Sequence, residues 1–442
     1  MKKKYILPTL ISAITFMLAE LIYYYTDLKS LTVWTLNIWD TLANSHNLRD
    51  FYSFSSLNLQ NLDHAMVGSD ILIYIPWAIW NLPIWILQHF AGMAVVTHPA
   101  MLLWSKLFLA VVFCLCFFPV KRIIKHIDNS KDNIIRMFFL SATSFFTITS
   151  LAYIGQNDVV VIFSFLMAIS ALLDSHTKSF MSWAALSIAF KPFFIFAYVG
   201  LVLLTDKNLL RIVGKIALGF SVFIIQKIPF IGAPMYKESL SYGPTSGSLK
   251  LLLDSTLDLP PYGASLFFLG LITLYAYAYF CDKELKPVDI IYMSVAPMII
   301  LFLFSRYEVY RPFYLVPIIY ILMMCKPQFS RINLMLETLA TFSLYLFYMM
   351  DDLLFYNPNY IIGGKNTPAL SQWLQGLIPG FGYPLLTAVF AFCMILILIL
   401  NHPSFKYENK VLIMDEEPYL LTIRSLCFSA PVIISILVKL FI

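Results

Sequence analysis

Residues 155–173 read GQNDVVVIFSFLMAISALL, a short polar junction followed by a long apolar run. A second apolar run precedes the junction, so Asp158 lies between two segments that could each enter a bilayer. A carboxylate is costly to hold near hydrocarbon, and its presence there indicates a functional site. Asp158 could also cap the helix that begins at Val159, and this role is compatible with a site residue.

The composition extends this pattern to the whole chain. Of 442 residues, 60% are hydrophobic and 12% are charged, and the mean hydropathy is +0.78. Apolar runs of roughly 17 to 25 residues, the length that crosses about 30 Å of hydrocarbon, follow one another along the sequence. These runs do not alternate as barrel strands do. The sequence therefore predicts an all-α fold, a polytopic membrane helical bundle of about twelve spans in contact with membrane lipids.

Two other features narrow the class of protein. The six cysteines show no metal-ligand or disulfide spacing, and we interpret them as packing residues. Nothing in the distribution of the basic residues indicates a nucleic-acid partner.

The positions of basic residues predict the topology. The lysines at positions 2–4 precede an apolar run, 5–25, with no small-residue cleavage site after it, which favours a first spanning helix over a signal peptide. With those lysines in the cytoplasm, segment 26–99 begins outside. If 71–96 crossed the membrane, the basic stretch 121–136 would lie outside, against the positive-inside rule. We therefore expect surface or re-entrant helices in 71–96 and a second span at 101–120.

The remainder of the chain fits the same scheme. We expect one membrane domain over 1–442, with core spans in 100–325 and C-terminal spans in 326–442. Pro192 should break a helix next to Lys191, because proline lacks the backbone N–H that a helix interior needs. The junctions expected to face outward are 155–158, 231–263, 306–311 and 351–382.

Ionisable residues gather on this predicted outer side. Asp27 directly follows the first helix, Asp70 lies in the first external segment, and Lys191 interrupts an apolar run. Residues 305–312 read SRYEVYRP and supply Arg306, Glu308 and Arg311. This inventory suits a reaction in which a carboxylate takes a proton from a hydroxyl while basic side chains hold a phosphate.

Each candidate also has a simpler interpretation. Asp40, Asp50 and Asp63 lie in a stretch that reads as a polar loop, where solvated residues or helix caps are common, although we keep Asp40 as a catalytic candidate. Asp27 could cap the first helix, and Lys191 could extend its ammonium group to the interface. Arg306 and Glu308 could simply pair with each other.

The order of these motifs resembles a known family. Residues 155–158 and the later Phe190-Lys191-Pro192 resemble the Gly-Gln-x-Asp and Lys-Pro patterns of bacterial multi-pass glycosyltransferases of the GT-C superfamily, relatives of the GPI mannosyltransferases. The first external segment is similar to that of the family in its Asp27-Leu28, its Trp34 or Trp39, its Phe51-Tyr52 and its stretch 70–76. Residues 307–312 resemble the family's His-Glu-Arg-Tyr motif, although Tyr307 and Val309 replace its His and Arg. Arg306 and Arg311 are candidate substitutes.

The resemblance implies a reaction and roles. It implies inverting transfer of one sugar from a polyprenyl-phosphate-sugar donor to a glycan or lipid-linked acceptor, such as a cell-wall polymer, outside the cytoplasmic membrane. By analogy Asp27 would be the general base, and Asp158 would place the acceptor or a divalent cation, Mg²⁺ or Mn²⁺. Lys191, Arg306 and Arg311 would bind the donor phosphate. Gln156, Asn157, Asp70 and Glu308 complete the expected substrate-binding set; the metal ligands are unknown, and no other cofactor is implied.

Three other classes of protein stay open. A lipid-linked oligosaccharide transporter should show similarly broken helices in two halves, and only the Lys191-Pro192 break is evident. A polysaccharide polymerase should concentrate arginines in large external loops, but 231–263 contains none. An inactive subunit of a surface-polymer assembly is the third.

Overall fold

The computed structural model shows a helical protein. It describes residues 6–24, 26–57, 67–92, 98–127, 131–242, 252–253, 255–257, 263–305, 311–350, 359–360, 382–405 and 418–441. Regular structure in these ranges is almost entirely helical, which confirms the predicted all-α class. The strands form two antiparallel pairs of two residues each: β1 (Tyr23–Tyr24) with β4 (Asn359–Tyr360), and β2 (Thr256–Leu257) with β3 (Ala264–Ser265).

The helices group into two compact units, each assembled from segments that are distant in the sequence. Unit 1 comprises Met1–Tyr25, Ile124–Ile154 and Val309–Ile442, and unit 2 comprises Thr26–Ile123 and Gly155–Glu308. Helix α6 (Phe117–Lys125) crosses the boundary between them.

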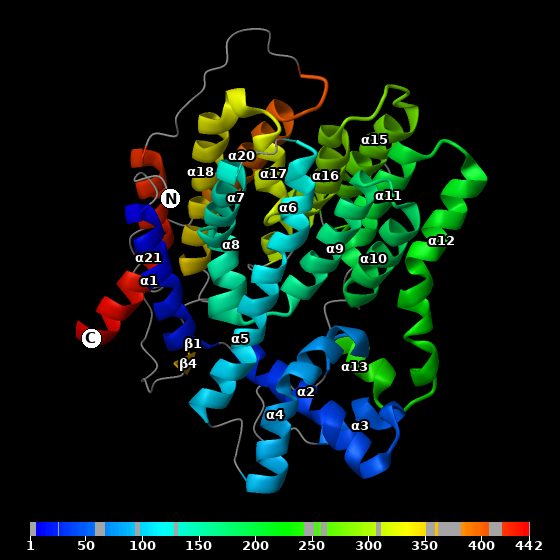
Figure 1. The fold of residues 1–442 in the computed structure, drawn as a ribbon, viewed down its shortest axis with the longest axis vertical. Coiled ribbons are helices and arrows are strands. Elements are labelled where there is room, and N and C mark those ends of the chain that lie inside the picture. Colours follow the sequence, from blue (N-terminus) through cyan, green and yellow to red (C-terminus); the bar gives the residue numbers. More distant parts are fainter. Residues whose placement is uncertain are drawn as a thin grey trace. The chain divides into compact units, whose positions relative to one another are not determined.

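Unit 2 is a bundle with an additional group of helices, most of them from residues 26–99 (Figure 1). In the bundle, α10 packs against α9 and α12, and α11 packs against α15 and α16. In the additional group, α2 packs against α3, α4 and α5, and α13 contacts α3. The bounds are α2 (Thr26–Ser45), α3 (Phe51–Leu57), α4 (Ile75–Ala91), α5 (Pro99–Leu115), α9 (Asp158–Leu173), α10 (Thr177–Phe190), α11 (Ile195–Thr205), α12 (Leu209–Ile225), α13 (Tyr236–Tyr242), α15 (Leu266–Phe280) and α16 (Pro287–Phe304).

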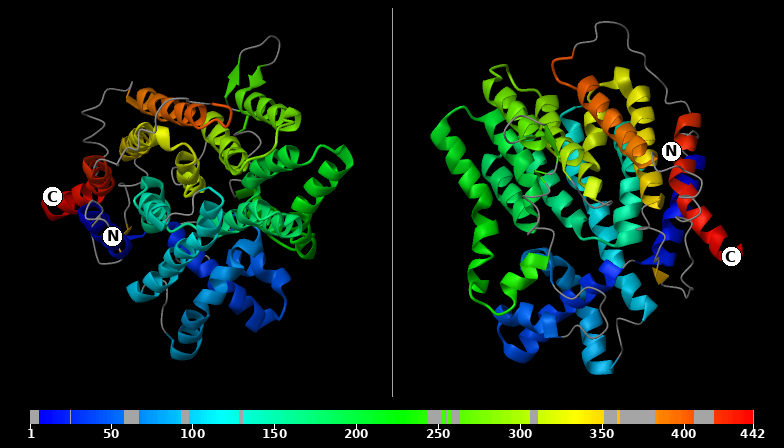
Figure 2. Two further views of the ribbon diagram at one scale, coloured as in Figure 1. Left: turned by 45° about the horizontal axis from the view of Figure 1, so that its top comes forward. Right: turned by 180° about the vertical axis from the view of Figure 1, so that it is seen from behind.

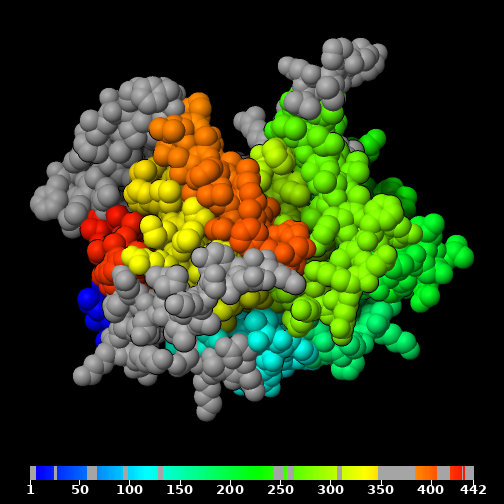
Figure 3. Space-filling model, turned by 90° about the horizontal axis from the view of Figure 1, so that it is seen from above, coloured from blue at the N-terminus to red at the C-terminus, as the bar shows by residue number. Residues whose placement is uncertain are grey.

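Unit 1 brings the two ends of the chain together. Its helices are α1 (Ile6–Ile22), α7 (Lys131–Ala142), α8 (Phe145–Thr147), α17 (Ile318–Met324), α18 (Ser330–Met350), α20 (Gly382–Leu400) and α21 (Pro418–Phe441). The first and last helices, α1 and α21, lie side by side (Figure 2), and Ser12 and Ser425 share a hydrogen bond of 3.0 Å between them. Helix α20 lies along α18 (Figure 3), where Asn333 and Asn401 exchange amide hydrogen bonds.

Shorter turns connect these helices. A π-helical turn covers Ile148–Ile154, and the 3-10 helices are Leu48–Asp50, Ile71–Ile73, Pro192–Phe194, Ile228–Phe230, Arg311–Leu315 and Pro327–Phe329.

Several helices could cross a membrane. Among the described residues, Pro99–Lys125, Leu209–Phe230 and Pro287–Phe304 are long and apolar enough, and Asn133–Ala142 with Phe145–Ile154 forms a fourth candidate bent by 53°. The predicted second span falls within the first of these. Helix α12 exposes large apolar side chains along its length, including Leu210 at 85% and Val213 at 64%. Such a surface is suited to contact with lipid.

The predicted helix break is confirmed. Helix α10 ends at Phe190, Lys191 is extended, and the chain resumes as a 3-10 turn and then α11. The first helix is shorter than expected, ending at Ile22. Segment 71–96 contains α4, and its surface or re-entrant placement stays a prediction.

Candidate functional site

The junction at Gly155–Asp158 is held in a conformation that only glycine accepts easily. Gly155 has φ +74°, and a Cβ atom there would lie 2.9 Å from Cβ of Leu28. The next helix, α9, begins at Asp158, and Asn157 is its N-cap residue, so the alternative in which Asp158 caps this helix is wrong by one position. The junction therefore packs directly against the start of α2.

Asp27 lies at that start. It follows the first helix, as expected, but it lies in the first turn of α2, so the alternative in which it caps the end of the first helix is wrong. A negative charge is favourable there because the backbone N–H groups of the first turn give the helix a partial positive end. The amide of Gln156 donates a hydrogen bond to Oδ2 of Asp27. The structure thus joins two candidates that are far apart in the sequence.

Asp158 and Lys191 form a second pair at the same junction. The carboxylate is completely buried, and the lysine side chain, 12% exposed, forms an ion pair with Oδ1. Lys191 reaches it because the chain leaves helical geometry between α10 and Pro192. A buried charge needs such a partner, since desolvation otherwise favours the neutral form. Asn157 is also buried, with 2% of its surface exposed.

The aromatic residues predicted in the first external segment gather around Tyr74. Its ring makes an edge contact with Trp34, with centroids 5.9 Å apart, and a tilted contact with Phe51 at 6.3 Å. Burial raises the pKa of the Tyr74 phenol, and the carboxylates of Asp70 and Asp27 raise it further. Tyr74 therefore lies within electrostatic reach of two of the candidate carboxylates.

Asp70 has partners that the sequence did not indicate. Lys227 forms an ion pair of 2.5 Å with Oδ2, and the Tyr236 hydroxyl donates a 2.9 Å hydrogen bond to Oδ1. A signal was present in the sequence, because Lys227 follows an apolar run and lies two residues before Pro229, much as Lys191 precedes Pro192.

Asp40 is not part of this arrangement. Instead of lying in a polar loop, it sits in α2, about 20 Å along the helix from Asp27 at 1.5 Å per residue. Its Oδ1 accepts a 2.6 Å hydrogen bond from the Trp85 indole, and burial raises its pKa, against the lowering effects of that bond and of His89. We assign it to the α2–α4 contact. Asp50 ends the 3-10 helix Leu48–Asp50, and Asp63 lies outside the described residues.

The late motif is only partly described. Residues 306–310, which include Arg306 and Glu308, lie outside the described residues. Arg311 is the first residue of the 3-10 helix Arg311–Leu315 in unit 1, where it is buried.

A further buried cation, Lys106, was missed. It lies on the buried face of α5 and is 1% exposed. The adjacent Ser105 shares a 2.7 Å hydrogen bond with Thr32 of α2 and accepts another from Asn81 of α4. A lone lysine within an apolar run was the available signal.

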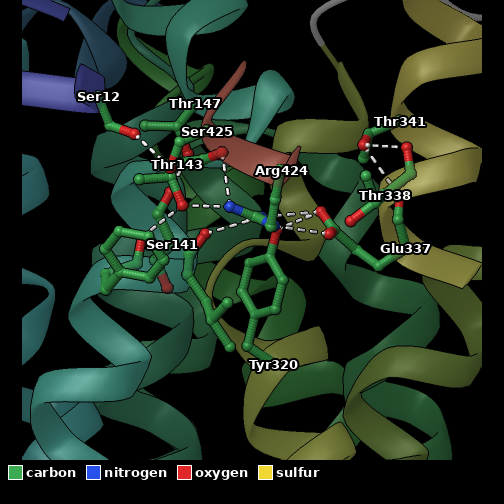
Figure 4. Close-up of polar contacts among 12 residues, drawn as sticks. Ser12, Ser141, Thr143, Thr147, Tyr320, Glu337, Thr338, Thr341, Arg424 and Ser425 are labelled. Atoms are coloured by element: carbon green, nitrogen blue, oxygen red, sulfur yellow. Dashed lines mark hydrogen bonds and ion pairs between the residues drawn. The ribbon is translucent and has the colours of Figure 1, made fainter. Parts of the chain in front are cut away.

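Unit 1 contains a separate polar cluster that sequence reasoning also missed (Figure 4). Arg424 of α21 is 3% exposed and forms an ion pair with Glu337 of α18, itself 1% exposed, at 3.0 Å. Its guanidinium also donates to the hydroxyl of Tyr320 at 2.8 Å and to the carbonyls of Leu140 and Thr143.

The bonds within this cluster are extensive. The Tyr320 hydroxyl donates to Glu337 at 2.6 Å, so arginine, carboxylate and phenol satisfy one another. A shallow recess adjoins Arg424 and is lined by Thr143, Thr338, Thr341 and Tyr345, among others. The cluster ties four separate segments of unit 1 together. The signal in the sequence was that Glu337 and Arg424 are isolated charged residues within apolar runs.

We searched the described residues for groups of side chains that could bind a metal ion. Across the ranges that the structure describes, no group of three or more His, Cys, Asp or Glu side chains is placed to hold an ion. Comparison of the chain with protein-family models, curated proteins and solved structures gives no match.

Proposed function

We propose that this protein is a membrane glycosyltransferase that moves a single sugar from a polyprenyl-phosphate-sugar donor to a glycan or lipid-linked acceptor. The observation that carries the proposal is the junction in unit 2, where Gln156 contacts Asp27 while Asp158 pairs with Lys191. In this proposal Asp27, at the start of α2, is the carboxylate base, and Lys191, just past the end of α10, is the cation that binds phosphate. In a site with little water, fixed charges of this kind act strongly on a developing charge.

The fold and orientation belong to the same proposal. The three to four candidate spans and six shorter apolar helices of the described residues are compatible with a GT-C-like bundle of about twelve spans. We place the N-terminus in the cytoplasm, following its basic residues, and the junction at Gly155–Asp158 on the outer side.

The proposed reaction is a direct displacement with inversion. The acceptor hydroxyl oxygen forms a bond to the anomeric carbon as the bond from that carbon to the phosphate oxygen breaks. The bonding electron pair leaves with the polyprenyl phosphate, and the hydroxyl proton passes to the Asp27 carboxylate. Lys191 stabilises the leaving phosphate, and Gln156 orients Asp27. No step is assigned to a divalent cation.

The test removes each carboxylate charge while keeping the side-chain shape. The full chain, purified in detergent, is incubated with undecaprenyl-phosphate hexoses, beginning with mannose, and a cell-envelope glycan extract, and released undecaprenyl phosphate is measured. We expect Asp27→Asn to lower the rate by about 10² to 10⁴-fold, the usual contribution of a general base. Asp158→Asn should lower it as well, because Lys191 loses its charged partner.

The matched control is Asp174→Asn. Asp174 follows the other end of α9 and is also ion-paired, to Arg122, but it is remote from the junction along the helix. It should retain wild-type turnover. Wild-type turnover in both Asp27→Asn and Asp158→Asn would refute the proposed chemistry. Failure of the wild-type protein to consume any donor would instead favour a transporter or a polymerase.

A further inference from the structure

Lys227 and Lys191 each lie just past the C-terminal end of a helix, Lys227 after α12 and Lys191 after α10. The amide of Gln226 donates a 2.7 Å hydrogen bond to the carbonyl of Ala189, two residues before Lys191. Helices α10 and α12 pack along each other (Figure 1), and this bond joins their C-terminal ends. The two lysines therefore extend from neighbouring helix ends in unit 2.

Each of these lysines is held by one aspartate. Lys191 pairs with Asp158 and Lys227 pairs with Asp70. The turn Ile71–Ile73 that follows Asp70 packs against α10, so both pairs belong to the same region of unit 2. Because each lysine is paired with an aspartate, the two ion pairs together carry no net charge.

The Lys227 pair is built so that it can exchange partners. The lysine side chain is 28% exposed, and its ammonium group lies 4.4 Å from the centroid of the Phe223 ring. If the ammonium turns toward an anion, Asp70 keeps the hydrogen bond from the Tyr236 hydroxyl. The carboxylate thus retains a donor when the lysine leaves, which lowers the cost of the exchange.

We propose that Lys227 binds the phosphate of the polyprenyl donor together with Lys191. This inference rests on the proposed function and deepens it. The donor phosphodiester carries one negative charge, and the departing polyprenyl phosphate carries nearly two. A second ammonium group therefore matches the charge that develops as the sugar leaves. Asp70 holds Lys227 in place before the donor arrives.

Ligand-induced protection of the full chain in detergent tests this role. Its thermal unfolding is followed with undecaprenyl phosphate, with undecaprenol, with inorganic phosphate and with phosphatidylglycerol. Wild-type protein should be protected by undecaprenyl phosphate and not by the alcohol. Lys227→Met should weaken the apparent affinity for undecaprenyl phosphate by about 10- to 100-fold, the range of one charge-assisted hydrogen bond. Lys227→Arg should recover most of it.

Two further variants separate binding from folding. Lys227→Met leaves Asp70 without its ion-pair partner, so Asp70→Asn/Lys227→Met should regain the unfolding temperature but not the affinity. Lys215→Met is the matched control: Lys215 lies on α12 in a similar pair, 2.9 Å from Asp206, and is 20% exposed. It should leave the affinity unchanged.

The outcomes distinguish the two proposals. Equal affinity for undecaprenyl phosphate in wild type and Asp70→Asn/Lys227→Met would overturn the role of Lys227 and leave the transferase proposal standing. Equal protection of the wild type by phosphatidylglycerol or inorganic phosphate would show a general anion site and overturn the donor assignment. Wild type without protection by undecaprenyl phosphate would overturn both.

Discussion

At the scale of single residues, Gly155 is the position where the junction tolerates least change. Gly155→Ala would put a side chain into the left-handed region, at a cost of about 1–2 kcal/mol, and its Cβ would contact Leu28 at 2.9 Å. We expect a lower unfolding temperature and reduced transfer, because the contact of Gln156 with Asp27 depends on this turn. Thermal unfolding in detergent and the turnover assay measure the two effects.

Two comparisons sharpen this prediction. Gly214 lies in α12 with open space around it, so Gly214→Ala should be neutral or stabilising by about 0.5–1 kcal/mol. Leu28→Ala removes the Cδ1 and Cγ contacts at 3.0 and 3.3 Å but keeps the Cβ contact and the backbone strain, so it should recover only a small part of the loss in Gly155→Ala. If Gly155→Ala behaves like Gly214→Ala, the conformation described for the junction is wrong.

The sequence identified some residues of the site and missed others for a physical reason. Asp27, Gln156, Asp158 and Lys191 stand out because polar side chains are rare in apolar runs, and the structure pairs them. Lys227 is equally visible in the sequence. Its importance depends on Asp70, which lies 157 positions away, and no local pattern specifies such a contact.

At the scale of elements, the sequence predicted the long apolar helices better than the mixed ones. The break at Lys191-Pro192 follows from proline chemistry alone. Helix α2 was read as a polar loop because charged residues punctuate it, yet its buried positions Leu28, Leu31 and Thr35 recur with helical spacing. The charged residues of this segment hid the helical spacing of its apolar positions, which pack against the neighbouring helices.

The last helix, α21, gives an element-scale prediction. Arg424 fastens it to α18 and to the end of α7 through buried bonds. Arg424→Leu should destabilise the protein by about 3–5 kcal/mol, since it leaves the Glu337 carboxylate buried without its ionic partner. Thermal unfolding of the purified chain measures this loss.

A double variant that also removes Glu337, and a variant of another arginine on α18, serve as comparisons. Arg424→Leu combined with Glu337→Leu should recover part of the loss, because no buried charge then remains unpaired. Arg331 of α18 is only half-buried and bonds the Tyr419 hydroxyl near solvent, so Arg331→Leu should change stability by less than about 1 kcal/mol. Equal losses in Arg424→Leu and Arg331→Leu would contradict the assignment.

At the scale of the whole molecule, the division into two units could not be read from the sequence. Unit 1 joins the first helix to the last, and residues 124–154 to residues after 309. The sequence shows a series of similar apolar runs, which specifies that helices form but not which helices pack together. Such pairing depends on side-chain fit between distant segments.

The proposed orientation gives a prediction for the whole chain that rests on α12. Lys207, just before this helix, donates a 2.7 Å hydrogen bond to the carbonyl of Ala278, so the loops at 206–208 and 281–286 lie at one end of unit 2. The candidate span Leu209–Phe230 has 22 residues, about 33 Å of helix, and it carries the chain away from that end.

In a cysteine-free chain, Ser241→Cys should therefore react with a membrane-impermeant maleimide on intact cells, whereas Asp282→Cys should react only after permeabilisation. Both side chains are exposed, so burial would not explain a difference. Labelling of Asp282→Cys alone on intact cells would reverse the orientation that places the donor site outside. Labelling of both positions would leave that orientation without support.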